Sequence, residues 1–139
     1  MIYVADKDFD AQAGLIEFIG LRGDYRLVAW LYPEAEASSI ASISVESSDL
    51  EQVTTYTPAV QAKHTAPIQF SSELLARFVG SKPAIKEHCD SLALYEVGST
   101  SWAAASIGHE GMSLVRDVAA LDSLVEAGFP ASLEAPSWW

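Results

Sequence analysis

His109 and Glu110 are the first candidates for chemistry because they stand between two glycines, in the sequence Gly108-His109-Glu110-Gly111. A loop between two strands would present both side chains, and loops carry function more often than cores do. An imidazole and a carboxylate could act as general base and acid. A zinc protease would need a second histidine four residues on, where this chain has Ser113. The alternative is that the glycines only form a tight turn and the polar pair faces water.

Cys89 is the only cysteine, and its neighbours in the chain are a histidine and an aspartate. A thiol with a nearby base suggests a nucleophile, but neighbouring residues on a helix point about 100° apart. The base would therefore come from another segment, such as His64 or His109. The alternative is core packing, because free cysteines are among the most buried residues. The catalytic interpretation is thus a small hydrolase or transferase that uses Cys89, or His109 with Glu110.

Four acidic residues near the start match the ligand spacing of a calcium loop. Asp6, Asp8, Asp10 and Glu17 fall at positions 1, 3, 5 and 12 of the EF-hand pattern. The sixth position, where that loop needs glycine, is Ala11, and too few residues precede the pattern to form an entering helix. The aspartates fit better at the positive end of a helix, where carboxylates accept free N–H groups. We therefore predict no metal and no cofactor.

Helices and strands together would position these residues. Apolar residues at intervals of three and four, with start and stop signals, predict helices at 8–23, 71–80, 83–90 and 117–128. Alternating and β-branched residues predict strands at 24–32, 40–46, 52–57, 92–97, 102–107 and 112–116. Asp8 or Asp10 would cap the first helix, and Ser71 or Ser72 the second. Residues 58–67 are predicted to form a loop.

The order of these elements predicts an α+β fold. Strand 24–32 is apolar on both alternations, which suits a central strand covered on both faces. Segments 40–46 and 52–57 should pair as a hairpin, as should 102–107 and 112–116. We expect a mainly antiparallel sheet of about six strands with about four helices packed on it, rather than a doubly wound α/β fold. The chain should form a single globular domain over residues 1–139, with 131–139 as a short C-terminal tail.

The composition excludes several classes of function. The 139 residues are 50% hydrophobic, which argues against global disorder, and carry 8 basic and 19 acidic side chains, a net charge of -11. This charge repels nucleic acids and anionic membranes, so neither is an expected partner. The opening lacks the pattern of a signal peptide, and no apolar run is long enough to span a membrane. With a lone cysteine as well, we expect a cytoplasmic protein.

The distribution of charge and aromatic residues favours a protein partner. Residues 1–58 hold 10 acidic and 3 basic side chains, a net charge of -7. Acidic surfaces attract basic proteins and accelerate their encounter. The chain ends in Ser137-Trp138-Trp139, and two indoles at a terminus either fold back onto the domain or anchor a partner. The alternative is that the acidic charge only keeps the protein in solution.

In size, acidity, lack of an export signal and absence of a catalytic motif, the chain resembles the immunity proteins of bacterial polymorphic-toxin and contact-dependent inhibition systems. The resemblance is to the class and not to one immunity family. It implies a cytoplasmic inhibitor that binds a cognate toxin domain, often a basic nuclease, and blocks its active site or substrate groove.

The leading hypothesis is therefore a stoichiometric binding protein that neutralises a basic toxin domain. Its carboxylates would steer the partner and its terminal indoles would anchor it. The alternatives are the small hydrolase or transferase described above and a phage-encoded or regulatory adaptor protein. The oligomeric state is left open. The predicted contact residues are Asp6, Asp8, Asp10, Asp24, Glu34, Glu36, Trp138 and Trp139.

Overall fold

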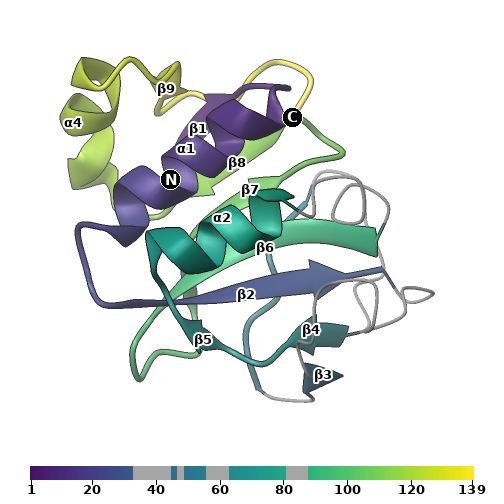
Figure 1. Cartoon of the computed structure of the whole chain (residues 1–139). Coiled ribbons are helices and arrows are strands. Elements are labelled where there is room, and N and C mark those ends of the chain that lie inside the picture. The colour runs from purple at the N-terminus through teal and green to yellow at the C-terminus, as the bar shows by residue number, and fades with distance from the viewer. Residues whose placement is uncertain (33–44, 47–48, 56–62, 81–87) are drawn as a thin grey trace.

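One antiparallel sheet forms the centre of the molecule (Figure 1). The computed structural model describes residues 1–32, 45–46, 49–55, 63–80 and 88–139. In this part of the chain the strands run in the order β3-β4-β2-β6-β7-β8-β1-β9, and β5 pairs with β2 next to β4. The strands are β1 (Ile2–Ala5), β2 (Tyr25–Leu31), β3 (Val45–Glu46), β4 (Lys63–Thr65), β5 (Ile68–Gln69), β6 (Cys89–Glu96), β7 (Trp102–Ile107), β8 (Met112–Val115) and β9 (Ala131–Ser132).

The helices cover one face of this sheet. Helices α1 (Phe9–Gly20) and α2 (Ser72–Gly80) lie side by side on it (Figure 1), and α4 (Leu121–Glu126) follows a short 3-10 turn at Val118–Ala120. All three bury apolar side chains in the same cluster, with Leu124 as the contribution of α4. The prediction of an α+β fold with a mainly antiparallel sheet is therefore confirmed.

The helices begin where the sequence predicts. The Asp8 carboxylate accepts the backbone N–H two residues on at 3.1 Å, and the Ser71 hydroxyl accepts the N–H three residues on at 3.0 Å. Asp117 caps the 3-10 turn in the same way at 2.9 Å. Each cap satisfies a donor that would otherwise lack an intrahelical partner.

The second face of the sheet carries its own apolar cluster. Val28 and Trp30 point to this face from β2, whereas Leu27, Ala29 and Leu31 point to the helices. The strand is thus covered on both sides, as its double alternation predicts. The other buried members of the second cluster are Val53, Ala93, Tyr95, Trp102, Ala105, Ile107, Met112 and Leu114.

In the described part of the chain, the sheet has more strands than predicted and the helices are fewer. The described residues form nine strands rather than about six, and three α-helices rather than about four. Strand β1 was missed, and β9 lies within the expected C-terminal tail. Most of the helix predicted at 83–90 falls outside the described residues, but Cys89 and Asp90 are in β6, so its end was wrong. Helical spacing in so short a segment cannot be distinguished from a buried strand.

The hairpin of 102–107 with 112–116 is confirmed, whereas one pairing prediction and one loop prediction were wrong. Val45–Glu46 pairs with Lys63–Thr65 and not with residues 52–55, which form no strand. Residues 40–44 and 56–57 of that predicted hairpin lie outside the described part. The loop predicted at 58–67 contains β4, which is fixed to β2 because the Thr65 hydroxyl accepts the Ala29 N–H at 2.9 Å. A local sequence pattern can indicate a strand, but it does not determine which strand pairs with it.

Within the described residues, no helix combines the length and the hydrophobicity that crossing a membrane requires.

Packing between the end of α1 and the sheet can be tested by adding one methyl group. A Cβ on Gly20 would lie 2.5 Å from the buried Phe70 ring, so we expect Gly20→Ala to lower the free energy of unfolding by about 1–3 kcal/mol. Gly14→Ala is the matched control, because a Cβ there meets no atom within 4 Å. In mid-helix that change should be stabilising by about 0.5–1 kcal/mol. Equal effects in urea unfolding would contradict this packing.

Candidate functional site

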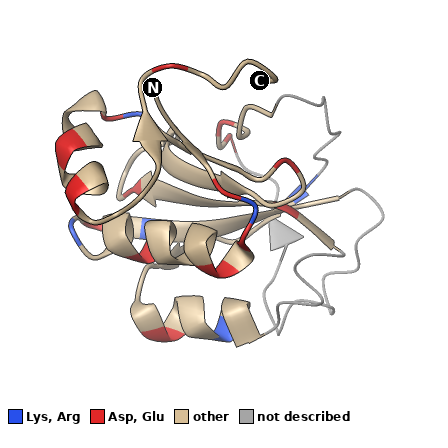
Figure 2. Ribbon diagram, turned by 90° about the horizontal axis from the view of Figure 1, so that it is seen from above, with Lys and Arg blue, Asp and Glu red and all other residues tan. Residues whose placement is uncertain are grey.

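The outer surface of the helical layer is acidic (Figure 2). Helix α1 contributes Asp10 and Glu17 and no basic residue, and α4 contributes Asp122 and Glu126, again with no basic residue. Helix α2 adds Glu73 together with one arginine near its end. The three helices therefore carry five carboxylates against one cation. This excess of carboxylates makes the electrostatic potential at this face negative.

A groove of about 350 Å³ separates α1 from α2 on this face. Asp10 and Glu17 lie seven residues apart, so they point the same way two helical turns from each other. Between them Ala13 and Gly14 leave the groove open, because their side chains are small or absent. The wall from α2 consists of Ser72, Leu75, Ala76 and Val79. The groove thus has a largely apolar lining with two carboxylates from one side.

The other predicted acidic contacts are dispersed. Asp8 caps α1, and the Asp6 carboxylate accepts the Asp8 N–H at 2.9 Å, so these two lie beside Asp10 at the start of the helix. Asp24 lies beyond the other end of α1 and accepts a hydrogen bond from Gln69 at 2.7 Å. The predicted contacts Glu34 and Glu36 fall outside the described residues.

The EF-hand spacing does not produce an EF-hand loop. Asp6 and Asp8 bind backbone N–H groups, and Glu17 lies two turns along α1. In the described part of the chain, no three His, Cys, Asp or Glu side chains are grouped to hold a metal ion.

The two terminal indoles have different surroundings. Trp139 contacts Tyr3 with ring centroids 6.4 Å apart and packs against the apolar cluster on the second face. Trp138 stands edge-on to Trp139 at 6.1 Å and is 46% exposed. Trp139 therefore docks on its own sheet, and Trp138 is the indole available to a partner.

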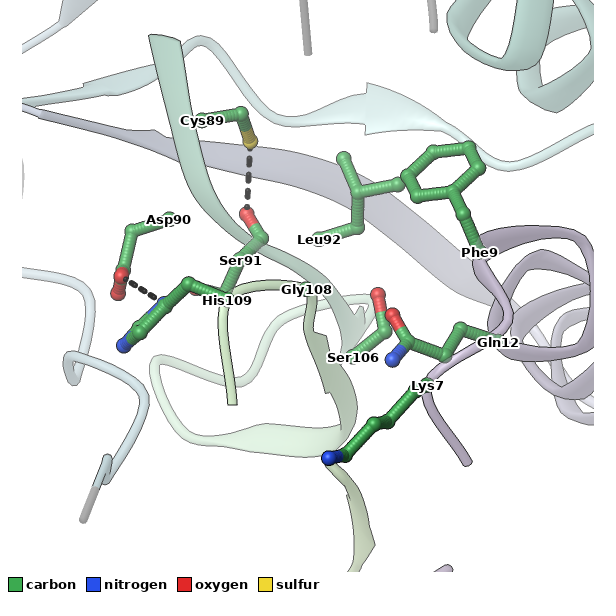
Figure 3. A pocket seen from close by; sticks show the side chains of 10 residues that line it. All are labelled: Lys7, Phe9, Gln12, Cys89, Asp90, Ser91, Leu92, Ser106, Gly108 and His109. Carbon is green, nitrogen blue, oxygen red and sulfur yellow. Dashed lines mark hydrogen bonds and ion pairs between the residues drawn. The ribbon is translucent and has the colours of Figure 1, made fainter. Parts of the chain in front are cut away.

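A second candidate site is a cavity of about 270 Å³ between the start of β6, the β7–β8 turn and the start of α1 (Figure 3). Both Cys89 and His109 line it. The two glycines of the turn differ: Gly111 has a φ of +63°, which favours glycine, whereas Gly108 does not adopt a positive φ, so only one of the two is needed for the turn. Opposite it, Leu31 pairs with Cys89 and Trp30 with Ser91, so the residue between them is bulged out of the ladder. That residue is Asp90.

The bulge brings Asp90 to His109. The Asp90 carboxylate, which is fully buried, lies 2.8 Å from Nδ1 of His109, and Nε2 of the same ring lies 3.5 Å from the Glu110 carboxylate. Burial raises the pKa of Asp90 above its ordinary value; His109 opposes this shift, Glu110 adds to it and a hydrogen bond with Tyr32 opposes it. Burial, with Asp90 next in importance, raises the pKa of Tyr32 to about 12.

An aspartate on one imidazole nitrogen is the arrangement that orients a histidine to act as a base with the other. Here the other nitrogen faces Glu110, and Figure 3 shows the His109 ring turned toward Asp90 and away from Ser106 and Gln12. The geometry therefore links the turn to the start of β6, and both ring nitrogens of the histidine face carboxylates.

Cys89 is poorly suited to be a nucleophile. Its side chain is buried and its Sγ donates to the Ser91 carbonyl at 3.3 Å. Burial, with a further contribution from the Asp90 carboxylate, raises the thiol pKa far above its ordinary value, so the reactive thiolate is scarce. His64, the other base considered, is buried on β4, where its Nδ1 lies 2.8 Å from the Thr65 carbonyl. The structure brings Cys89 and His109 to one cavity but not His64.

Sequence reasoning missed Asp90 as the partner of His109, and Gln12 and Ser106 as lining residues. The pairing depends on a strand bulge that no local pattern signals. Gln12 had a detectable signal, because it is a polar residue on the apolar side of a predicted helix.

Comparisons of this chain with protein-family models, with curated proteins and with solved structures found no match.

The inert state of the thiol can be tested by alkylation. We expect Cys89 in the folded protein to react with iodoacetamide at pH 8 about 100-fold more slowly than in urea, because the thiol is buried and protonated. Labelling would be followed by mass spectrometry. Equally rapid labelling of the folded and unfolded chains would restore Cys89 as a candidate nucleophile.

The buried carboxylate predicts a pH-dependent difference in stability. Because the pKa of Asp90 is raised in the folded state, the folded chain holds the carboxyl proton of Asp90 more tightly than the unfolded chain does. The wild-type protein should therefore lose stability relative to Asp90→Asn as the pH rises from below 3.8 through the raised pKa. Urea unfolding across this range measures the difference, with Asp122→Asn as the control for a surface carboxylate. A difference that stayed constant or ran the other way would refute the assignment.

Proposed function

We propose that this chain is a stoichiometric binding protein that neutralises a basic protein domain, in the manner of an immunity protein. The observation that carries the proposal is the groove between α1 and α2, which has Asp10 and Glu17 along one side and a largely apolar lining. Lysine and arginine side chains lay their aliphatic stems on apolar surface and keep their charge at the edge. The groove fits such side chains.

The electrostatics of the whole chain support the same choice. A net charge of -11 and helices with five carboxylates and one cation would draw a basic partner to this face. Desolvated contacts in the groove would then set the lifetime of the complex, and the surrounding charges its rate of formation.

Trp138 is a separate contact in this proposal. It stands beside Trp139, which packs against the cluster on the face opposite the helices. A partner seated in the groove would reach Trp138 only by extending round the edge of the sheet at β9. The groove is therefore the primary interface, and Trp138 is a second anchor for a partner large enough to reach it.

A small hydrolase or transferase remains a second candidate, favoured by the 2.8 Å contact between Asp90 and His109 at the wall of a cavity. It would use His109 as the base, because Cys89 is buried and its thiolate is disfavoured. The position of Glu110 beside Nε2 weakens this interpretation. A regulatory adaptor would use the groove to hold a partner without blocking its activity.

Charge reversal in the groove tests the proposal. Asp10→Lys with Glu17→Lys should abolish capture of a basic protein from the native cell at low salt, and should lower its association rate about tenfold or more. Asp122→Lys with Glu126→Lys is the matched control, because it makes the same change in net charge on α4 and leaves the groove intact; it should slow association to a smaller extent and preserve capture. Circular dichroism would check that both variants fold.

The captured protein would then be expressed with and without this chain. Toxicity relieved by wild type and by the α4 variant, but not by the groove variant, is the expected result. A partner that is captured but not inhibited would favour the adaptor. Equal capture by both variants, or no partner at low salt, would contradict the proposed interface.

A further inference from the structure

The cavity beneath the start of α1 contains a buried hydrogen-bond acceptor for which the described residues supply no donor. Gln12 is 2% exposed, and its Nε2 donates to the Asp6 carbonyl at 2.7 Å. This hydrogen bond fixes the orientation of the amide, because the carbonyl can accept only from the nitrogen side. The Gln12 Oε1 then has no partner among the described residues. A buried acceptor without a donor costs free energy, so it marks a position where a donor from a ligand would be favoured.

The sheet below Gln12 is polar at the same place. Ser106 pairs with Leu92 on one side and with Ser113 on the other, so the three share the face that α1 covers. Both serines are buried, and the Ser113 hydroxyl has no partner in the described part of the chain. The cavity therefore lies over a polar patch within an otherwise apolar layer, and Ser106 lines it directly.

Lys7 brings a cationic side chain to the wall of the cavity. A Cβ on Gly111 would lie 2.6 Å from the Cγ of Lys7, so the aliphatic stem of Lys7 packs closely against the β7–β8 turn. Lys7 is exposed and forms no ion pair with a described residue. Figure 3 shows its ammonium pointing away from Gln12 and outward. A carboxylate at the mouth would give this cation a partner.

The remaining walls limit the size and polarity of an occupant. Phe9 and Leu92 provide apolar contact opposite the Asp90–His109 pair (Figure 3). The volume of about 270 Å³ lies just below the range usual for ligand pockets, so it suits a molecule of few heavy atoms. Lys7 at the mouth disfavours a cation entering alone, and the buried carboxylate of Asp90 disfavours an anion entering deeply.

We propose that this cavity binds a small amino-carboxylate, such as a free amino acid, with its ammonium donating to Gln12 Oε1 and its carboxylate paired with Lys7. The side chain of the ligand lies against Phe9 and Leu92. Neither the groove nor the partner of the proposed function takes part in this binding, so the two proposals fail independently.

Titration of the isolated full chain with each of the twenty free amino acids tests the site, with ligand-observed NMR to detect binding and protein-observed NMR to follow the Gln12 side chain. At least one small apolar amino acid should bind, with L-valine as the first probe, and should shift the side-chain amide resonance of Gln12. Isobutylamine and 3-methylbutanoate, which each carry one half of the polar groups of valine, should bind about tenfold more weakly. No binding by any amino acid at about 10 mM would overturn the proposal.

Two variants locate the site. Lys7→Gln should weaken amino-acid binding about tenfold and should not weaken the binding of isobutylamine, which has no carboxylate to pair with Lys7. Gly108→Ala should weaken binding at least as much, because its methyl group would enter the cavity 4.0 Å from Gln12 Oε1 without steric conflict. Gly14→Ala makes the same change in the groove and should leave the affinity unchanged. Binding that both Lys7→Gln and Gly108→Ala leave intact would place the ligand elsewhere and refute the assignment.

Discussion

The pairing of β2 with β6 is the constraint on which the rest of the structure depends. Both strands are buried on their two faces for most of their length, and their register runs from Tyr25 opposite Glu96 to Leu31 opposite Cys89. A shift of one residue would exchange the side chains that face the helices with those that face the second cluster. The bulge at the end of this ladder turns Asp90 toward the β7–β8 turn, so the same pairing builds the wall of the cavity.

Polar groups on this double-sided sheet are tolerated where they are paired. On the second face the Trp30 indole donates to the Tyr95 hydroxyl at 2.8 Å, and that hydroxyl donates to the Glu51 carbonyl at 2.8 Å. These bonds satisfy the Glu51 carbonyl, and the Trp102 indole donates to the Gln52 carbonyl at 3.1 Å, where the segment packs on this face through Val53. Asp90 is a different case, because its pairing with His109 does not fully offset the loss of water, and its pKa stays raised.

Local chemistry made part of this fold predictable. The Asp8 and Ser71 caps, the double alternation of β2 and the glycines of the β7–β8 turn all act within a few residues, so the sequence alone locates them. The pairing of β3 with β4 and the position of Asp90 beside His109 depend on segments far apart in the chain. Loop closure and burial decide such pairings, and neither is visible in a local pattern. The sequence predicts an excess of acidic residues, but it does not predict the groove between α1 and α2.

Gln12 shows how a local inconsistency can point to a site. Its neighbours on the inward side of α1 are Phe9, Ile16 and Ile19, which recur at three- and four-residue intervals and are buried in one apolar cluster. An apolar residue in its place would continue that cluster and remove a buried acceptor without a donor. The glutamine therefore makes the packing of α1 on the sheet less favourable than an apolar residue would. Sequences whose local choices oppose the global fold do so mainly where a site requires it, and here the opposing residue lines the cavity that Lys7 and Ser106 also line.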